Sequence, residues 1–267
     1  MIRVPILMYH SVTDRPRPET RSLAVRPSAF AEQLSYVKER GFTPLTLGDL
    51  VAAVHNSGGR ELPGKPIVVT FDDGYADFHA EALPVLTRLG VPATIFLTSG
   101  WMRDAGADAA GRPLDTMLSY GQAAEVASCG IEIGGHSHSH PQLDQLPIAE
   151  LRQELKRNKA LLEDRIGTPV ATMAYPFGYS SARVRREVRK AGYWAACAVG
   201  NGIATDRHDV LAVPRLTVGW NMGMTRFARA VEGRTVPLIY LRERALTKGY
   251  AMVRRTRYAV RQVAHGD

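Results

Sequence analysis

The sequence contains few cysteines and no long apolar run. Only Cys129 and Cys197 occur in 267 residues, too few for a disulfide-stapled fold, and we expect both to be buried free thiols. The absence of about 18 consecutive apolar residues predicts that no helix spans a membrane. The opening MIRVPILMYH lacks the small-residue cleavage site of a secretion signal. These absences predict a cytoplasmic protein, or an extracellular one if a leader has been removed.

Acidic residues are outnumbered by basic ones. The chain has 34 Lys and Arg against 26 Asp and Glu, a net charge of +8, which predicts a surface that attracts anions. The excess is greatest between Arg234 and Arg261, where Glu243 is the single acid among eight basic residues. This tail could contact an anionic membrane or a glycosyltransferase, although such helices more often pack on their own domain. No nucleic-acid-binding signature accompanies it.

Strand-like and helix-like segments alternate along most of the chain. Six or seven such units predict an α/β fold with a parallel sheet covered by helices, either a barrel or a doubly wound sheet. We expect one main domain over residues 1–232 and a basic helical extension over residues 233–267. The expected strands are 4–10, 66–71, 92–98, 131–136, 170–176, 193–200 and 210–219. The expected helices are 28–41, 46–59, 76–89 with a kink at Pro84, 119–130, 147–167 and 181–192.

Two stretches at predicted strand ends carry groups able to bind metal. TFDDG (70–74) places adjacent aspartates after one strand, and GGHSHSHPQL (134–143) places three histidines within five residues after another. An aspartate there could simply cap a helix. His136 and His140, however, could reach one ion from a single helical turn, and imidazole nitrogens suit zinc and its neighbours. Asp72 or Asp73 would complete the ligand set and leave the other carboxylate free to take a proton from water.

TFDDG and HSHSH together resemble the first two motifs of the polysaccharide deacetylases of carbohydrate esterase family four. The resemblance covers about residues 4–218. It implies a distorted (β/α)₇ barrel with its site at the C-terminal ends of the strands. It also implies metal-dependent removal of N-acetyl groups from N-acetylhexosamine units of a polysaccharide or glycoconjugate. The cofactor would be one divalent ion, zinc in the first place, with Co, Ni or Fe as alternatives.

The resemblance assigns roles to individual residues. Asp72 would be the general base, and the metal ligands would be Asp73, His136 and His140. Ser137 would steady the histidine loop, and His138 matches a variable position outside the ligand set. In AYPFG (174–178), the backbone N–H of Phe177 would help to hold the oxyanion. We further expect Tyr175 and Trp220 to contact the substrate.

The third motif departs from the family pattern. Ala174 stands where an arginine normally orients the general base. The opening VPILMYHSV resembles a circularly permuted subgroup that deacetylates poly-N-acetylglucosamine, in which the general-acid histidine comes first in the chain. His10 would then be the general acid. We hypothesise that Arg215, in VPRLTV, replaces the missing arginine.

Two other functions are compatible with the same residues. One is hydrolysis of a cyclic amide (a ureide) on the same scaffold. The other is a sugar-binding module without turnover, which the complete set of acid, base and ligand residues disfavours. Acetate release with and without a chelator distinguishes these possibilities.

Overall fold

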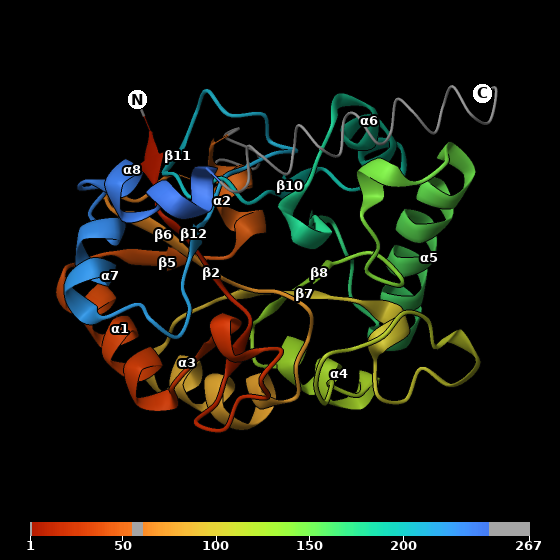
Figure 1. Cartoon of the computed structure of the whole chain (residues 1–267), viewed down its shortest axis with the longest axis horizontal. Helices are drawn as coiled ribbons and strands as arrows, with labels where there is room; N and C mark the ends of the chain where they lie inside the picture. The colour runs from red at the N-terminus through yellow and green to blue at the C-terminus, as the bar shows by residue number, and fades with distance from the viewer. Residues whose placement is uncertain (1, 55–60, 246–267) are drawn as a thin grey trace.

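Eight short strands form one curled parallel sheet, in which seven follow the order β10-β9-β8-β7-β6-β2-β12 and β5 (Thr43–Leu45) pairs with β6 off this path (Figure 1). The structure is a computed structural model, and it describes residues 2–54 and 61–245. Helices surround the sheet, as the predicted distorted (β/α)₇ barrel requires, so that prediction is confirmed. The strands are β2 Ile6–Tyr9, β6 Pro66–Phe71, β7 Thr94–Leu97, β8 Glu132–Gly135, β9 Thr172–Ala174, β10 Ala195–Cys197 and β12 Leu216–Thr217.

The last strand segment closes the barrel by pairing on both sides. Leu216 pairs with Leu7 of β2, while Val213, just upstream, forms a parallel bridge with Cys197 at the end of β10. Arg215 lies between these two contacts and is fully buried. The first and last strands of the barrel are therefore joined through the segment that carries Arg215.

β6 is an interior strand of the sheet, between β7 and β2, and all six of its residues are buried. Its Val and Ile side chains face helices or the barrel interior, as expected for a parallel strand covered on both sides. One edge pairs with β2, and β5 (Thr43–Leu45) and β7 pair with its first and last residues. Two short pairs lie outside this sheet: β1 (Arg3–Val4) with β11 (Ala204–Thr205), and β3 (Ser11–Val12) with β4 (Ala24–Val25).

The helices cover the outside of the barrel (Figure 1). α4 begins with a capping box in which Ser119 and Gln122 satisfy each other's backbone N–H groups. Instead of one kinked helix at 76–89, a π-helical turn (Phe78–Ala82) precedes α3, and Pro84 lies in the first turn of α3, where it breaks no hydrogen bond. The helices are α1 Pro27–Glu39, α2 Leu47–Val54, α3 Leu83–Leu89, α4 Tyr120–Ser128, α5 Ile148–Ile166, α6 Ala182–Lys190, α7 Met224–Val231 and α8 Val236–Ile239.

The described start of the C-terminal extension packs on the barrel. Val236 and Tyr240 are buried, and the Tyr240 hydroxyl donates to the carbonyl of Thr217 at 2.8 Å. Residues 246–267, on which most of the predicted basic tail falls, lie outside the described residues, as does the end of the predicted helix 46–59. In the described part of the chain, no helix combines the length and apolarity needed to cross a bilayer.

The two cysteines differ in exposure. Cys197 is buried at the end of β10, as expected, whereas Cys129 follows α4 and is exposed. The prediction of a buried thiol was therefore wrong for Cys129, because it follows the last turn of an amphipathic helix on the outer surface. Both are free thiols.

Candidate active site

Strand register brings the predicted site residues to one end of the barrel. Tyr9 pairs with Phe71, so His10 and Asp72 leave neighbouring strands at the same level. Leu97 pairs with Gly135, which places His136 beside the end of β7. Because parallel strands share a C-terminal edge, residues distant in sequence meet there.

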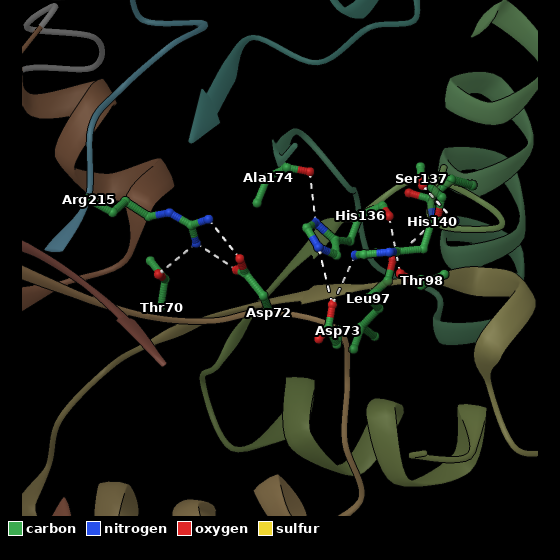
Figure 2. Close-up of polar contacts among 11 residues, drawn as sticks. Thr70, Asp72, Asp73, Leu97, Thr98, His136, Ser137, His140, Ala174 and Arg215 are labelled. Carbon is green, nitrogen blue, oxygen red and sulfur yellow. Dashed lines mark hydrogen bonds and ion pairs between the residues drawn. The ribbon is translucent and has the colours of Figure 1, made fainter. Parts of the chain in front are cut away.

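Asp73, His136 and His140 converge on one point (Figure 2). The Asp73 Oδ1 atom lies 3.3 Å from the Nε2 atom of His136 and 3.3 Å from the Nε2 atom of His140. Burial of Asp73 opposes its ionisation, but the hydrogen bonds from both imidazoles outweigh it and hold the pKa of Asp73 well below its usual range. Among residues 2–54 and 61–245, this is the one group of three or more His, Cys, Asp or Glu side chains arranged to hold a metal ion.

The donor set fits a divalent metal ion. The His136 Nδ1 atom lies 2.8 Å from the carbonyl oxygen of Ala174. A carbonyl only accepts, so Nδ1 donates to it, and with an ion bound Nε2 would present a lone pair in place of the hydrogen that it otherwise donates to Asp73. Ligands with bond lengths of about 2.0–2.2 Å at tetrahedral angles lie about 3.3–3.6 Å apart, which matches the Asp73–histidine separations. Asp73, His136 and His140 would therefore hold the ion that the family resemblance implies.

The histidine segment is a loop, and the expected helical turn is absent. Ser137 and His140 have left-handed backbone angles, with φ of 62° and 61°, which an α-helical turn excludes. The Ser137 hydroxyl accepts a hydrogen bond from the His140 backbone N–H at 3.0 Å, consistent with a role for Ser137 in steadying the loop. His138 points away from Asp73 and contacts the Ser99 hydroxyl through Nδ1 at 2.9 Å.

Two side chains of α5 hold this loop, and sequence reasoning missed both. Glu154 accepts hydrogen bonds from the backbone N–H groups of His138 and Ser139, each at 2.9 Å, and from the Ser139 hydroxyl at 2.6 Å. Asn158 is fully buried and donates through Nδ2 to the carbonyl oxygens of Leu97, at 3.0 Å, and Ser137, at 2.7 Å. These contacts join the loop to the end of β7 and fix the direction of its side chains.

Asp72 forms a bidentate ion pair with Arg215 (Figure 2). Arg215 Nη1 and Nη2 donate to the two carboxylate oxygens at 2.6 and 2.7 Å, and Nη1 also donates to the Thr70 hydroxyl at 3.1 Å. Burial raises the pKa of Asp72, but the Arg215 guanidinium outweighs that effect and the pKa is lowered. Asp72 therefore remains an oriented carboxylate. Arg215 lies directly before β12 and is fully buried.

Left-handed backbone conformations concentrate at this site. Six described residues other than glycine have positive φ, and four of them belong to the site: Asp73, Ser137, His140 and Phe177. Such conformations are unfavourable for side chains with a Cβ and persist where surrounding contacts enforce them. Their clustering indicates that these loops are shaped to place particular groups.

A cavity of about 450 Å³ opens over these residues. Its lining includes the paired aspartates, both metal-ligand histidines, His10 and Phe177. Burial lowers the pKa of His10, with a partial offset from the charges of Asp73 and Asp72. The Phe177 side chain is 50% exposed, and its ring lies 4.8 Å from that of His140.

Two predicted substrate contacts lie elsewhere. The Tyr175 side chain is fully buried and its hydroxyl donates to the Leu211 carbonyl at 2.7 Å, so it cannot touch a substrate. This prediction was wrong because Tyr175, directly after β9, points into the core. Trp220 lies outside the cavity and lines a neighbouring groove, where its contact with substrate stays a prediction.

Comparisons with known proteins agree with this geometry. Residues 59–196, just over half of the chain, match the family model described as polysaccharide deacetylase. The protein YxkH of Bacillus subtilis is 26% identical over 232 residues, which are 86% of this chain and 76% of that protein. Poly-beta-1,6-N-acetyl-D-glucosamine N-deacetylase of Escherichia coli is 25% identical over 84% of this chain. This match spans 38% of the length of the E. coli enzyme.

The fold matches solved structures over a similar range. The deacetylase PplD of Streptococcus pyogenes, solved in complex with acetate, has a TM-score of 0.76 and 25% identity. The match covers 86% of this chain and 98% of PplD. IcaB of Ammonifex degensii, at 24% identity, has the same fold, with a TM-score of 0.72 over 85% of this chain and 97% of that one. The chain therefore belongs to the polysaccharide deacetylase family and is a hydrolase of carbohydrate esterase family four.

Proposed function

We propose that this chain removes the acetyl group from N-acetylhexosamine units of a glycan and releases acetate and a free amine. The observation that carries the proposal is the arrangement of Asp72, fixed by Arg215, beside the Asp73–His136–His140 group in one cavity. Similarity to enzymes named as poly-N-acetylglucosamine deacetylases supports N-acetylglucosamine polymers as the first substrates to test.

Asp72 has the properties of a general base. Its carboxylate is buried, ionised and oriented by two hydrogen bonds from Arg215. We propose that Asp72 accepts the proton of the water that attacks the acetyl carbonyl, because Asp72 borders the cavity beside the metal-ligand group. When bound by Asp73, His136 and His140, a divalent ion supplies Lewis-acid polarisation of the carbonyl and acidifies water.

His10 and Phe177 supply the two remaining groups that the reaction needs from the protein. The Phe177 backbone N–H is assigned to the oxyanion that develops on the carbonyl oxygen. His10 is assigned the proton that the departing nitrogen must receive when the C–N bond breaks. Burial lowers the pKa of His10, which makes its protonated form a stronger acid.

Acetate release from N-acetylglucosamine oligomers tests this function. We expect release by the metal-loaded protein, its loss on chelation, and a fall of about 10²–10⁴-fold in Asp72→Asn with bound metal retained. Asp164→Asn removes one negative charge from an exposed position on α5 and should leave the rate unchanged. Acetate release that is unchanged by the chelator and by Asp72→Asn contradicts the proposal. Activity on ureides alone, or sugar binding without acetate release, also contradicts it.

A further inference from the structure

A second groove lies beside the active-site cavity. It has a volume of about 330 Å³, and its lining includes Trp220, Arg226 and Tyr240. Leu23 lines both the groove and the active-site cavity. A glycan chain with one sugar at the catalytic aspartates would therefore find the groove along a continuous surface.

Two arginines lie against the ring of Trp220, the residue that lines this groove. The guanidinium carbon of Arg26 is 4.2 Å from the ring centroid, and that of Arg21 is 5.4 Å away. Both arginines are exposed, and neither makes an ion pair with a carboxylate in the described part of the chain. Arg226, by contrast, already contacts the Ile239 carbonyl and Glu243.

The backbone holds this cluster in place. A Cβ on Gly219 would come within 2.4 Å of the Ser22 carbonyl oxygen, so the Trp220 loop lies directly against the segment carrying Arg21. Arg21 and Leu23 belong to the same short 3₁₀ turn, Arg21–Leu23. The two guanidiniums thus lie against the Trp220 ring without an acidic partner in the described part of the chain.

This arrangement favours an anion. Cation–π attraction to an indole holds a guanidinium without using its N–H donors, which can still bind an anion. Two guanidiniums on one ring repel each other, and a phosphate or carboxylate that accepts from both relieves that repulsion. The net charge of +8 adds a general attraction for such ligands.

We propose that Arg21, Arg26 and Trp220 form a subsite for an anionic group, phosphate or carboxylate, carried by the glycan substrate. The proposal rests on the deacetylase function and narrows its substrate class to acidic glycans. Trp220 then holds the two arginines, whereas the sequence led us to expect that it contacts the substrate directly.

Fluorescence titration of the metal-loaded protein tests this subsite at low ionic strength, where charge–charge attraction is least screened. The probes are N-acetylglucosamine 6-phosphate, glucuronic acid and neutral N-acetylglucosamine. We expect a saturable tryptophan signal with a charged probe that disappears in Trp220→Phe. A signal that persists in Trp220→Phe overturns the proposal, because it would come from another tryptophan such as Trp101 in the cavity.

Matched variants distinguish binding at this subsite from a general effect of the protein's positive charge. The double change Arg21→Gln/Arg26→Gln should weaken binding of the charged probe at least about tenfold. Arg186→Gln/Arg189→Gln removes the same charge from exposed positions on α6 and should leave binding unchanged. Equal losses in both doubles, no loss in the first, or the same loss for the neutral sugar would each overturn the proposal.

Further arms identify the anion and guard against misfolding. Arg21→Lys/Arg26→Lys keeps both charges and should bind better than the glutamine double. Binding of the phosphate probe alone indicates a phosphorylated glycan, and binding of glucuronic acid alone indicates a uronic-acid glycan. Acetate release from neutral oligomers without anion binding would overturn the subsite and leave the deacetylase function standing. Anion binding without acetate release from any oligomer would overturn the deacetylase function and, with it, the assignment of the anion to a glycan substrate.

Discussion

The two halves of the active site are held by different kinds of structure. Asp72 is fixed by strand register and by Arg215 from the strand that closes the barrel. The loop 136–140 has no regular structure and is fixed by polar side chains of α5, chiefly Glu154 and Asn158. Asp72, the proposed base, therefore depends on the barrel itself, whereas the proposed metal ligands depend on a few hydrogen bonds from one helix. Variants on the two sides should change different properties.

Arg215→Ala gives the largest expected effect. Without the guanidinium, Asp72 loses its orientation and becomes an unpaired buried carboxylate, so turnover should fall by about 100-fold or more. The free energy of unfolding should also fall, by about 3–5 kcal/mol. Steady-state kinetics and metal analysis of the folded fraction provide the measurement, with metal content expected to stay at the wild-type level.

Arg215→Lys serves as the control for charge. It keeps the positive charge but cannot donate two parallel hydrogen bonds, so its rate should lie between those of wild type and Arg215→Ala. An unchanged rate in Arg215→Ala would remove this residue from the site. Loss of metal in that variant would show that the two halves are not independent.

Glu154→Gln addresses the other half. It weakens three hydrogen bonds to His138 and Ser139, and we expect the affinity for metal to fall by about 10–100-fold. Chelator competition measures this change, and saturating metal should restore most of the rate. Glu150→Gln makes the same change at an exposed position of the same helix and should have no effect. Wild-type metal affinity in Glu154→Gln would show that loop 136–140 keeps its conformation without the hydrogen bonds from Glu154.

Asp77 tests the turn that follows the paired aspartates. Burial raises the pKa of Asp77 to about 6, against hydrogen bonds from the Ser11 hydroxyl and the Val12 N–H. Between about pH 4 and 6 the folded state keeps a proton that the unfolded state releases, so wild-type stability falls as pH rises through this window. Asp77→Asn cannot ionise, and above pH 6 it should be more stable by about 3 kcal/mol.

Urea unfolding at several pH values measures the difference, which should vanish near pH 4. Asp164→Asn, an exposed substitution on α5, should follow the wild-type curve throughout. Parallel curves for Asp77→Asn and wild type would show that the Asp77 carboxyl is not the titrating group.

Phe177→Ala gives the smallest expected effect. The group assigned to the oxyanion is a backbone N–H, which alanine retains, so the rate should stay within about threefold of wild type. Tyr179→Ala, which removes the neighbouring ring at 6.0 Å, provides the packing control. A fall in rate of more than about 100-fold for Phe177→Ala alone would show that the reaction depends on the aromatic ring of Phe177.

Much of the fold could be predicted because the strands are short, apolar and separated by amphipathic helices. PIVVTF is a strand at the residues expected. Helix ends with strong caps, such as Ser119, were also predictable. The π-helical turn before α3 was not, because no sequence pattern distinguishes it from an ordinary first turn. Tyr175 was misplaced because a strand-end motif gives no information on which way one aromatic side chain points.

The site was predictable where it follows strand ends and not where it depends on a helix. Asp72, Asp73 and the histidines were visible as motifs. Glu154 appeared to be one more charge on a polar helix face. Asn158 did leave a signal: it occupies the buried stripe of α5 with Leu151, Leu155, Leu162 and Ile166. A polar residue in such a stripe must find buried partners, and those partners are the carbonyls of the site.

The pairing of β2 with β12 also has a consequence for folding during synthesis. Arg215 reaches Asp72 only when the last strand has joined the first, so a nascent chain lacking residues 213–217 has an unpartnered base. Because this pairing joins residues about two hundred positions apart, it forms late in folding. Ribosome-bound intermediates should therefore lack deacetylase activity, and activity should arise in one step when β12 pairs with β2.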